Sequence, residues 1–180
     1  MQTNFEYESR LSALEPLGDG HGYQHIWKEA AGNAAAGNAH INWFSNQKFY
    51  SLISVVEPGD DLIFARLGAN DPNFNLRHDP AFIIRKKEKK EATFVSIIEP
   101  HGAYDPVTEL SEQPFTSLEK VSVLQDDEDY TLIQFSNKGG KSWTLCLANS
   151  NASKVADHRL EIEEGVYSWQ GPFFLKRNKE

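Results

Sequence analysis

Apolar and polar residues alternate with a period of two along most of this chain, in short runs separated by turn residues. The alternation is clearest in Arg159-Leu160-Glu161-Ile162-Glu163, and the apolar run 130–135 is followed by the turn-forming Asn137-Lys138-Gly139-Gly140. Successive side chains of a strand point to opposite faces, so this period predicts strands. The alanine-rich stretch 30–39 contains glycines and asparagines that disfavour a helix. We therefore predict an all-β fold, an antiparallel two-sheet β-sandwich of about ten to thirteen strands.

The same pattern predicts which strands exist and which side chains form the core. Strands are expected at 22–30, 40–45, 48–56, 61–67, 81–85, 93–98, 121–125, 130–135, 142–148, 159–163, 167–169 and 173–175. The segments 61–67, 81–85 and 93–98 are expected to form a meander, in which neighbouring strands alternate direction. The predicted core consists of Ile63, Phe82, Ile84, Phe94, Ile97, Leu132, Phe135, Leu145 and Leu147.

Length and charge restrict the function classes. The 180 residues suit a single β-sandwich domain, residues 1–180. No apolar run approaches the roughly 20 residues of a membrane helix, and the first residues lack the basic start and apolar core of a signal peptide. The net charge of −8 argues against nucleic acid or an anionic membrane as partner. The basic run 85–90 is interpreted as a solvated turn, and the alternative is a contact with a polyanion.

Two polar segments follow apolar strands and are the candidates for a binding site. The segment Gly68-Ala69-Asn70-Asp71-Pro72-Asn73-Phe74-Asn75-Leu76-Arg77 is longer than a plain hairpin needs. Asn, Asp and Gly bond their own backbone, so such a loop can present polar groups rigidly, or it can merely shape the sheet edge. The second segment, Glu99-Pro100-His101-Gly102-Ala103-Tyr104-Asp105-Pro106, combines groups used in acid–base catalysis. Glu99 and His101 can equally form a local structural pair.

Other reactive side chains give weaker signals. His21 and His25 would lie about 13 Å apart on a strand, which is too far for two ligands of one metal ion unless His21 lies on the preceding turn. We predict no metal site and no cofactor in this chain. The single cysteine, Cys146, lies in an apolar strand and is expected to act as a small hydrophobe.

Three blocks in this order carry a resemblance to a known family. They are His21-Gly22-Tyr23-Gln24-His25-Ile26-Trp27, the segment 68–77, and Phe94-Val95-Ser96-Ile97-Ile98-Glu99-Pro100-His101-Gly102. Together they resemble the carboxy-terminal β-sandwich region of the heparinase II/III-like lyases, specifically the alginate and oligoalginate lyases of polysaccharide lyase family 17. The resemblance covers residues 15–110 well, and the remainder matches only in its strand pattern.

The resemblance implies a longer parent enzyme, with an α-helical catalytic toroid before the β-sandwich region. Such enzymes cleave uronic-acid polysaccharides or oligosaccharides by β-elimination at a uronate. The family's catalytic residues and zinc ligands have no counterpart in this chain, so we assign no catalytic or metal-binding residue here. The resemblance is compatible with a zinc ion only in the full-length parent. The resemblance also implies a periplasmic or secreted parent, with the toroid as intramolecular partner, and it allows a homodimer.

These observations leave two functional hypotheses. In the first, the chain is an ancillary domain of an alginate or oligoalginate lyase, inactive alone, that supports the catalytic cleft or a subunit interface. In the second, it is a stand-alone carbohydrate-binding module for uronic-acid polysaccharides. Under the first, we expect a polar patch at the cleft rim or interface, with Arg77 either binding a uronate carboxylate or pairing with Asp71 or Glu99 to lock the loops. The expected patch consists of Asn70, Asp71, Asn73, Arg77, Glu99 and His101.

Overall fold

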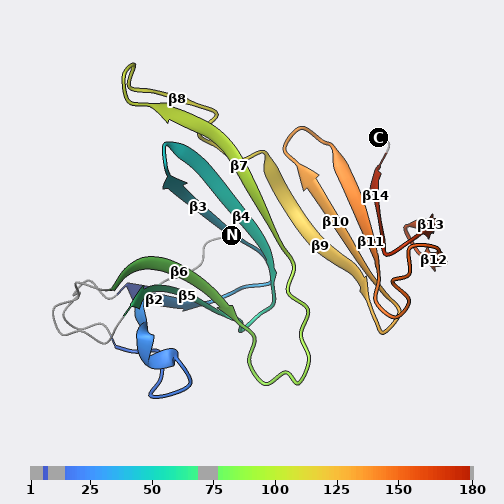
Figure 1. The fold of residues 1–180 in the computed structure, drawn as a ribbon, viewed down its shortest axis with the longest axis horizontal. Helices are drawn as coiled ribbons and strands as arrows, with labels where there is room; N and C mark the ends of the chain where they lie inside the picture. Colours follow the sequence, from blue (N-terminus) through green and yellow to red (C-terminus); the bar gives the residue numbers. More distant parts are fainter. Residues whose placement is uncertain (1–5, 8–14, 69–76, 179–180) are drawn as a thin grey trace. The chain divides into compact units, whose positions relative to one another are not determined.

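A computed structural model describes residues 6–7, 15–68 and 77–178 of the chain (Figure 1). These residues form antiparallel strands and one short 3₁₀ helix. They group into two compact units. Unit 1 comprises residues 1–37 and 56–92, and unit 2 comprises residues 38–55 and 93–180. The predicted all-β, antiparallel fold class is confirmed.

Unit 1 contains one four-stranded sheet. Its order is β1-β2-β5-β6, formed by β1 (Glu6–Tyr7), β2 (Ile26–Asn33), β5 (Asp61–Gly68) and β6 (Arg77–Arg85). The core side chains that are buried on β2 and β5 are Trp27, Ala30, Leu62, Ile63 and Ala65. The predicted strand at 22–30 begins later than expected, because Tyr23–His25 forms the 3₁₀ helix η2 after the left-handed residues His21 and Gly22.

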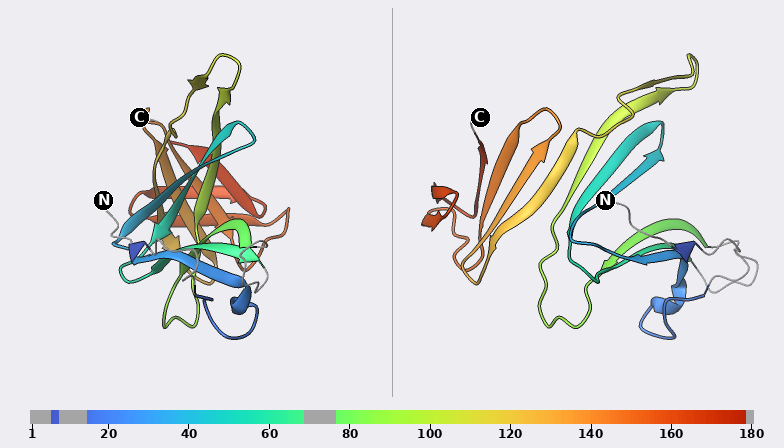
Figure 2. Two further views of the ribbon diagram at one scale, coloured as in Figure 1. Left: turned by 90° about the vertical axis from the view of Figure 1, so that its left-hand side faces the viewer. Right: turned by 180° about the vertical axis from the view of Figure 1, so that it is seen from behind.

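Unit 2 contains two four-stranded sheets and a separate hairpin. One sheet has the order β3-β4-β7-β8, from β3 (Gly37–Ser45), β4 (Lys48–Val56), β7 (Ser96–Asp105) and β8 (Leu110–Glu112). The other has the order β14-β11-β10-β9, from β9 (Leu118–Asp126), β10 (Tyr130–Asn137), β11 (Ser142–Ala148) and β14 (Phe173–Arg177). The hairpin consists of β12 (Asp157–Ile162) and β13 (Gly165–Gln170) and runs across the second sheet (Figure 2).

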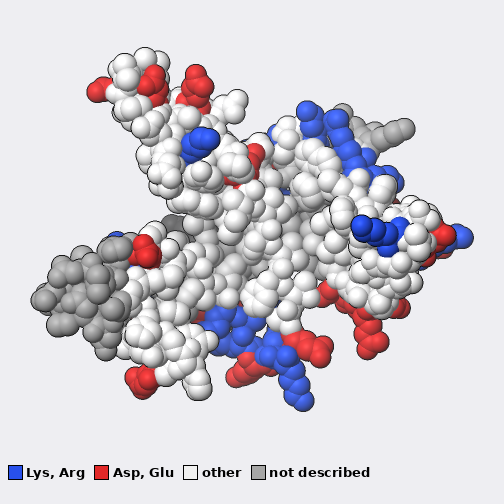
Figure 3. Space-filling view, viewed as in Figure 1, with Lys and Arg blue, Asp and Glu red and all other residues white. Residues whose placement is uncertain are grey.

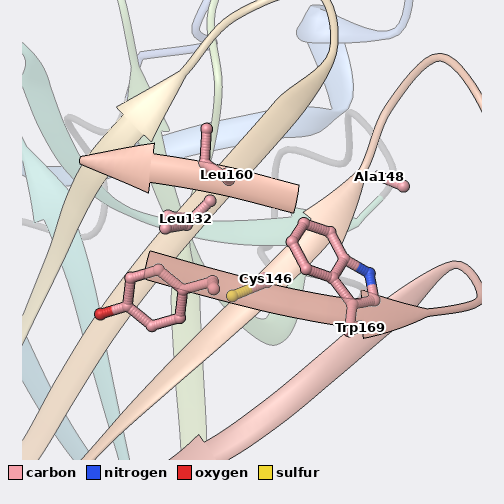
Figure 4. Close-up of a cluster of buried hydrophobic side chains, with 6 residues drawn as sticks. Leu132, Cys146, Ala148, Leu160 and Trp169 are labelled. Atoms are coloured by element: carbon pink, nitrogen blue, oxygen red, sulfur yellow. The ribbon is translucent and has the colours of Figure 1, made fainter. Parts of the chain in front are cut away.

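The central strands β10 and β11 are apolar on both faces and contribute to two cores. Ile133 on β10 packs with Ile53 of β4, so this face lies against the β3-β4-β7-β8 sheet. The adjacent residue Leu132 points to the opposite face, together with Cys146 of β11. There the hairpin covers it with Leu160, Tyr167 and Trp169 (Figure 4). Unit 2 is therefore a two-sheet sandwich with a hairpin as a third layer.

A turn with a side-chain cap joins these two central strands. The Asn137 side-chain oxygen accepts hydrogen bonds from the backbone N–H groups of Gly139 and Lys141, at 3.1 and 3.0 Å. Gly140 adopts a φ of 77°, a left-handed conformation that glycine accepts without a Cβ clash. The predicted turn at 137–140 is confirmed.

Two predicted strand assignments are wrong. The segments 61–67, 81–85 and 93–98 do not form a meander, since β6 pairs with β5 whereas β7 pairs with β4 and β8. The polar segment 99–106 is not a loop, because β7 continues through Asp105.

The predicted core is largely but not entirely correct. Ile63 and Leu132 are buried, and Ile97, Phe135, Leu145 and Leu147 are partly buried against the core of the sandwich. Phe82 and Ile84 are half-buried on β6. Phe94 is 59% exposed and is not a core residue, whereas its neighbour Val95 is buried. The prediction placed Phe94 and Ile97 in one core although residues three apart on a strand face opposite ways.

Candidate functional site

The predicted binding residues fall into three groups in the structure. Asn70, Asp71 and Asn73 lie outside the described residues. Arg77 begins β6, opposite Gly68 of β5, and belongs to unit 1. Glu99 and His101 lie on β7 in unit 2, on the same face of the strand. The proximity of Arg77 to the β7 pair therefore stays a prediction.

The Glu99 carboxylate binds the segment that precedes β9. It accepts hydrogen bonds from the hydroxyl groups of Thr116 and Ser117 and from the Ser117 backbone N–H, the last at 2.9 Å. Partial burial raises the pKa of Glu99, but the hydrogen bonds from Ser117 and Thr116 outweigh it and hold the pKa below its usual value. An ionised carboxylate with these partners is a structural acceptor and a poor general acid.

The His101 imidazole connects β4 to the segment after β8. Its Nδ1 lies 2.9 Å from the backbone oxygen of Gln113 and, because that oxygen can only accept, Nδ1 donates. Its Nε2 lies 2.8 Å from the Ser51 hydroxyl, which also contacts the Asn42 side chain. A serine beside a histidine is the arrangement of an activated nucleophile. Ser51, however, is only 2% exposed, so no substrate reaches its oxygen.

Gly102 completes this structural motif. It is the extra residue of a β-bulge, since Lys48 pairs with Ala103 and the next residue of β4, Phe49, pairs with His101. Its φ is +55°, and a Cβ there would lie 2.1 Å from the Glu112 backbone oxygen. Through these contacts, Glu99, His101 and Gly102 hold β7 against residues 112–117. This structural role accounts for each of these three residues.

The basic run after β6 is neutralised by acidic residues of the β4–β5 turn. Lys86 and Lys89 both pair with Glu57, and Lys86 also lies 3.6 Å from Asp60. The Lys86 side chain is only 5% exposed. Arg85 and Lys87 pair with Asp61, at 2.6 and 2.7 Å. Figure 3 shows blue and red side chains side by side at this edge. These pairs favour the solvated-turn interpretation over a polyanion contact.

The other titratable groups among the described residues serve the core or the surface. Among the described residues, no group of three or more His, Cys, Asp or Glu side chains could hold a metal ion. His158 is buried, stacked on Trp169 with ring centroids 5.0 Å apart, and serves the core. Burial raises the pKa of Cys146 to about 11, against a smaller lowering effect of Lys176, so its thiol is not a nucleophile at neutral pH.

Two surface features in unit 2 could receive a ligand, and sequence reasoning identified neither as a site. Trp43 on β3 is 38% exposed and stacks on Tyr50 of β4, with ring centroids 5.3 Å apart. The second is a cleft of about 600 Å³ between the hairpin and the β10-β11-β14 surface. It is lined by Gln134, Ser142, Glu164, Tyr167, Lys176, Arg177 and Asn178. Its residues come from distant strands, so no local motif could have revealed it.

Ser142, Tyr167, Lys176 and Asn178 of this cleft have partners within the chain. The Asn178 amide donates to the hydroxyl groups of Ser142 and Thr144, at 3.1 and 3.2 Å. The Lys176 ammonium lies 5.3 Å from the centre of the Tyr167 ring, a cation–π contact. The cleft is therefore structurally preformed, and its lining includes the cations of Lys176 and Arg177 and the carboxylate of Glu164.

Comparison with known proteins places this fold in context. No family model matches the chain. An exo-oligoalginate lyase of Saccharophagus degradans is 30% identical over 173 residues, which cover 93% of this chain and 23% of the relative. An alginate lyase of Stenotrophomonas maltophilia is 30% identical over 169 residues, which cover 94% of this chain and 22% of the relative. The chain matches a region of the alginate lyases.

The match with alginate lyases extends the resemblance seen in the sequence. It covers 93–94% of the chain and so extends into the carboxy-terminal part that had matched only in its strand pattern. The chain nevertheless spans less than a quarter of the length of either alginate lyase. Within the part that the structure describes, no helix is long and apolar enough to cross a membrane.

Proposed function

We propose that this chain is an ancillary β-sandwich region of a lyase that cleaves alginate or oligoalginate by β-elimination. It supports the catalytic cleft or a subunit interface and supplies no catalytic residue. The observation that carries the proposal is the match of nearly the whole chain to less than a quarter of two alginate lyases. The internal hydrogen bonds of Glu99 and His101 support a structural contribution of the motif on β7.

The remaining features of the proposed parent follow from the family resemblance. The partner of this region is an α-helical catalytic toroid in the same polypeptide, and the parent works in the periplasm or outside the cell on uronic-acid chains. The segment 68–77 contributes to the rim of the cleft. Zinc, where the parent needs it, is held by residues outside this chain.

An activity assay of the isolated chain tests the catalytic part of this proposal. The purified chain is incubated with alginate and with alginate oligomers, and the absorbance of unsaturated uronate products is followed. We expect no product, because Glu99 is engaged as an acceptor and the Ser51 hydroxyl is buried. Product formation that disappears in the Glu99→Gln or His101→Ala variant would show that β7 carries the chemistry.

A deletion in a relative tests the supporting role. Removing the matching region from the Saccharophagus degradans exo-oligoalginate lyase should lower its melting temperature and its kcat together. Replacing that region with this chain should restore both, at least in part. An enzyme that keeps its stability and kcat without the region would contradict the supporting role.

The second candidate function, carbohydrate binding by the chain alone, is favoured by the Trp43–Tyr50 stack and the cleft beside Lys176. Aromatic rings stack on apolar faces of sugars, and an ammonium group attracts a uronate carboxylate. Affinity electrophoresis through alginate-containing gels distinguishes the two functions. Retardation that is lost in both Trp43→Ala and Lys176→Ala variants would favour the binding module.

A further inference from the structure

The two edges of the β14-β11-β10-β9 sheet differ in how their backbone groups are satisfied. At the β9 edge, the Asn38 side chain mimics a neighbouring strand: its Nδ2 donates to the Val121 oxygen at 2.7 Å and its Oδ1 accepts from the Val121 N–H at 3.1 Å. The β9 ladder also contains two register shifts. Bulges and covering groups are devices that prevent pairing with another chain.

The β14 edge has neither of these devices. Its ladder with β11 is regular from Phe173 to Arg177, with no register shift. The Ala148 N–H donates to the Pro172 oxygen, and the Asn178 N–H donates to the Ser142 oxygen. Because bonded pairs alternate in an antiparallel ladder, residues 174 and 176 also bond to β11. The N–H and C=O groups of Phe173, Leu175 and Arg177 therefore point away from the sheet, without a partner among the described residues.

The side chains at this edge are apolar and open to solvent. Phe173 is 62% exposed and Leu175 is 52% exposed, and both lie on the face of the sheet that carries Leu145 and Leu147. A regular edge strand with free backbone groups and exposed apolar side chains is a template for another strand. The sequence of β14 itself indicates which strand can pair with this edge.

We propose that β14 pairs with β14 of a second copy of this chain, antiparallel and centred on Leu175. In this register, three residue pairs exchange backbone hydrogen bonds: Phe173 with Arg177 of the second copy, Leu175 with Leu175, and Arg177 with Phe173. In this register, Leu175 faces Leu175 of the second copy, Phe173 faces Arg177, and Phe174 faces Lys176. Each cation lies beside an aromatic ring, which attracts it.

Neighbouring registers fit less well. A shift that places Lys176 opposite Lys176 faces two like charges across the axis and loses one of the three bonded pairs. A shift in the other direction makes Phe174 face Phe174 of the second copy. Lys176 then faces no aromatic residue, and Arg177 pairs with Gly171. The centred register is therefore the one that uses all free backbone groups and matches both cations.

The outward direction of the Leu175 N–H supplies a selective variant. Leu175→Pro removes this donor without removing a bond to β11, and proline is tolerated on edge strands. Leu175→Thr keeps the donor and serves as the control for the lost apolar side chain. Sedimentation analysis of the 180-residue chain should show a dimer that dissociates on dilution. The Leu175→Pro variant should weaken dimerisation at least about tenfold, more than Leu175→Thr, because both copies lose a hydrogen bond.

Cross-linking tests the register even where the proline variant is poorly folded. In a Leu175→Cys variant, the two introduced thiols face each other at a Cα separation of about 5.5 Å, which suits a disulfide. A Phe173→Cys variant places its thiol opposite Arg177 and should not cross-link, and the buried Cys146 does not interfere. A chain that stays monomeric at all concentrations, or a dimer in which Phe173→Cys cross-links as readily as Leu175→Cys, would overturn the proposal.

Discussion

At the scale of single residues, the polar motif on β7 shows how a constellation typical of catalysis can serve the fold. Glu99 contacts Thr116 and Ser117, whereas His101 and Gly102 lie against the backbone at Glu112 and Gln113. Glu99 and His101 are two residues apart, so both titratable side chains lie on one face, as a catalytic pair would require. The sequence does not reveal that their partners are backbone groups and hydroxyls of a segment more than ten residues away.

The Glu99 carboxylate should make stability depend on pH. Its pKa is lowered in the folded chain, so its contribution is complete above the ordinary value of 4.5 and is lost as the pH falls through the lower folded value. Glu99→Gln should cost about 1 kcal/mol at pH 7, a modest amount because the group is only partly buried. Urea unfolding of the unmodified chain and the variant at pH 7 and at pH 3 measures the loss in unfolding free energy at each pH. An equal loss at both pH values would contradict an ionised, hydrogen-bonded Glu99.

Gly102 should tolerate no side chain. Gly102→Ala forces a Cβ into the backbone oxygens of Glu112 and Gln113 at a positive φ, so we expect a loss of more than about 2 kcal/mol. Gly59 is a matched control, since it also has a positive φ, but a Cβ added there would meet no atom within 4 Å. Thermal unfolding of both alanine variants separates the clash from the backbone conformation. Equal losses would mean that the close approach contributes nothing.

At the scale of strands, the alternation of apolar and polar residues predicted where strands occur better than which strands pair with each other. The strands at 61–67, 130–135 and 159–163 were found because each has a local pattern typical of a strand. The pairing of β4 with β7 joins residues more than forty positions apart, and no local pattern specifies it. The beginning of β7 was misjudged because Val95, rather than Phe94, shares the inward face with Ile97.

Core and exposed positions of the predicted strands should respond differently to truncation. Leu132→Ala removes a fully buried side chain from the centre of β10 and should cost about 2–5 kcal/mol. Phe94→Ala, although it removes a larger side chain, should cost less than about 1 kcal/mol because Phe94 is mostly exposed. Guanidinium unfolding of the two variants gives the comparison. A larger loss for Phe94→Ala would show that this ring is covered in solution.

At the scale of the whole molecule, net charge and the three-block resemblance restricted the function classes. The charge of −8 argues against nucleic acid or an anionic membrane as partner, and Lys86 and Lys89 of the one strongly basic run pair with Glu57. The three-block resemblance pointed to alginate lyases, and the comparison with known proteins confirms that likeness over nearly the full chain. The role of residues 70, 71, 73 and 77 stays a prediction, because the first three lie outside the described residues and Arg77 belongs to a different unit from Glu99 and His101.

Neutralisation of the basic run should be visible in binding to polyanionic resin. The chain should elute early from heparin, since Lys86 and Lys89 are paired with Glu57. Glu57→Gln removes the carboxylate that both ammonium groups share and should increase retention, measured as the salt concentration at elution. Glu161→Gln changes the net charge equally at an exposed position on β12 and should have a smaller effect. Equal retention of the two variants would mean that only the net charge matters.

The two apolar faces of β10 and β11 have a consequence for how these strands find their alignment. In a strand with one polar face, sliding by one residue exposes the core side chains, and this cost fixes the alignment. Here a slipped pair would still present apolar side chains to both layers. The hairpin turn supplies alignment information, since the Asn137 side chain accepts hydrogen bonds from the N–H groups of Gly139 and Lys141. The amide side chain of Asn137 thus favours the observed alignment of the two most apolar strands.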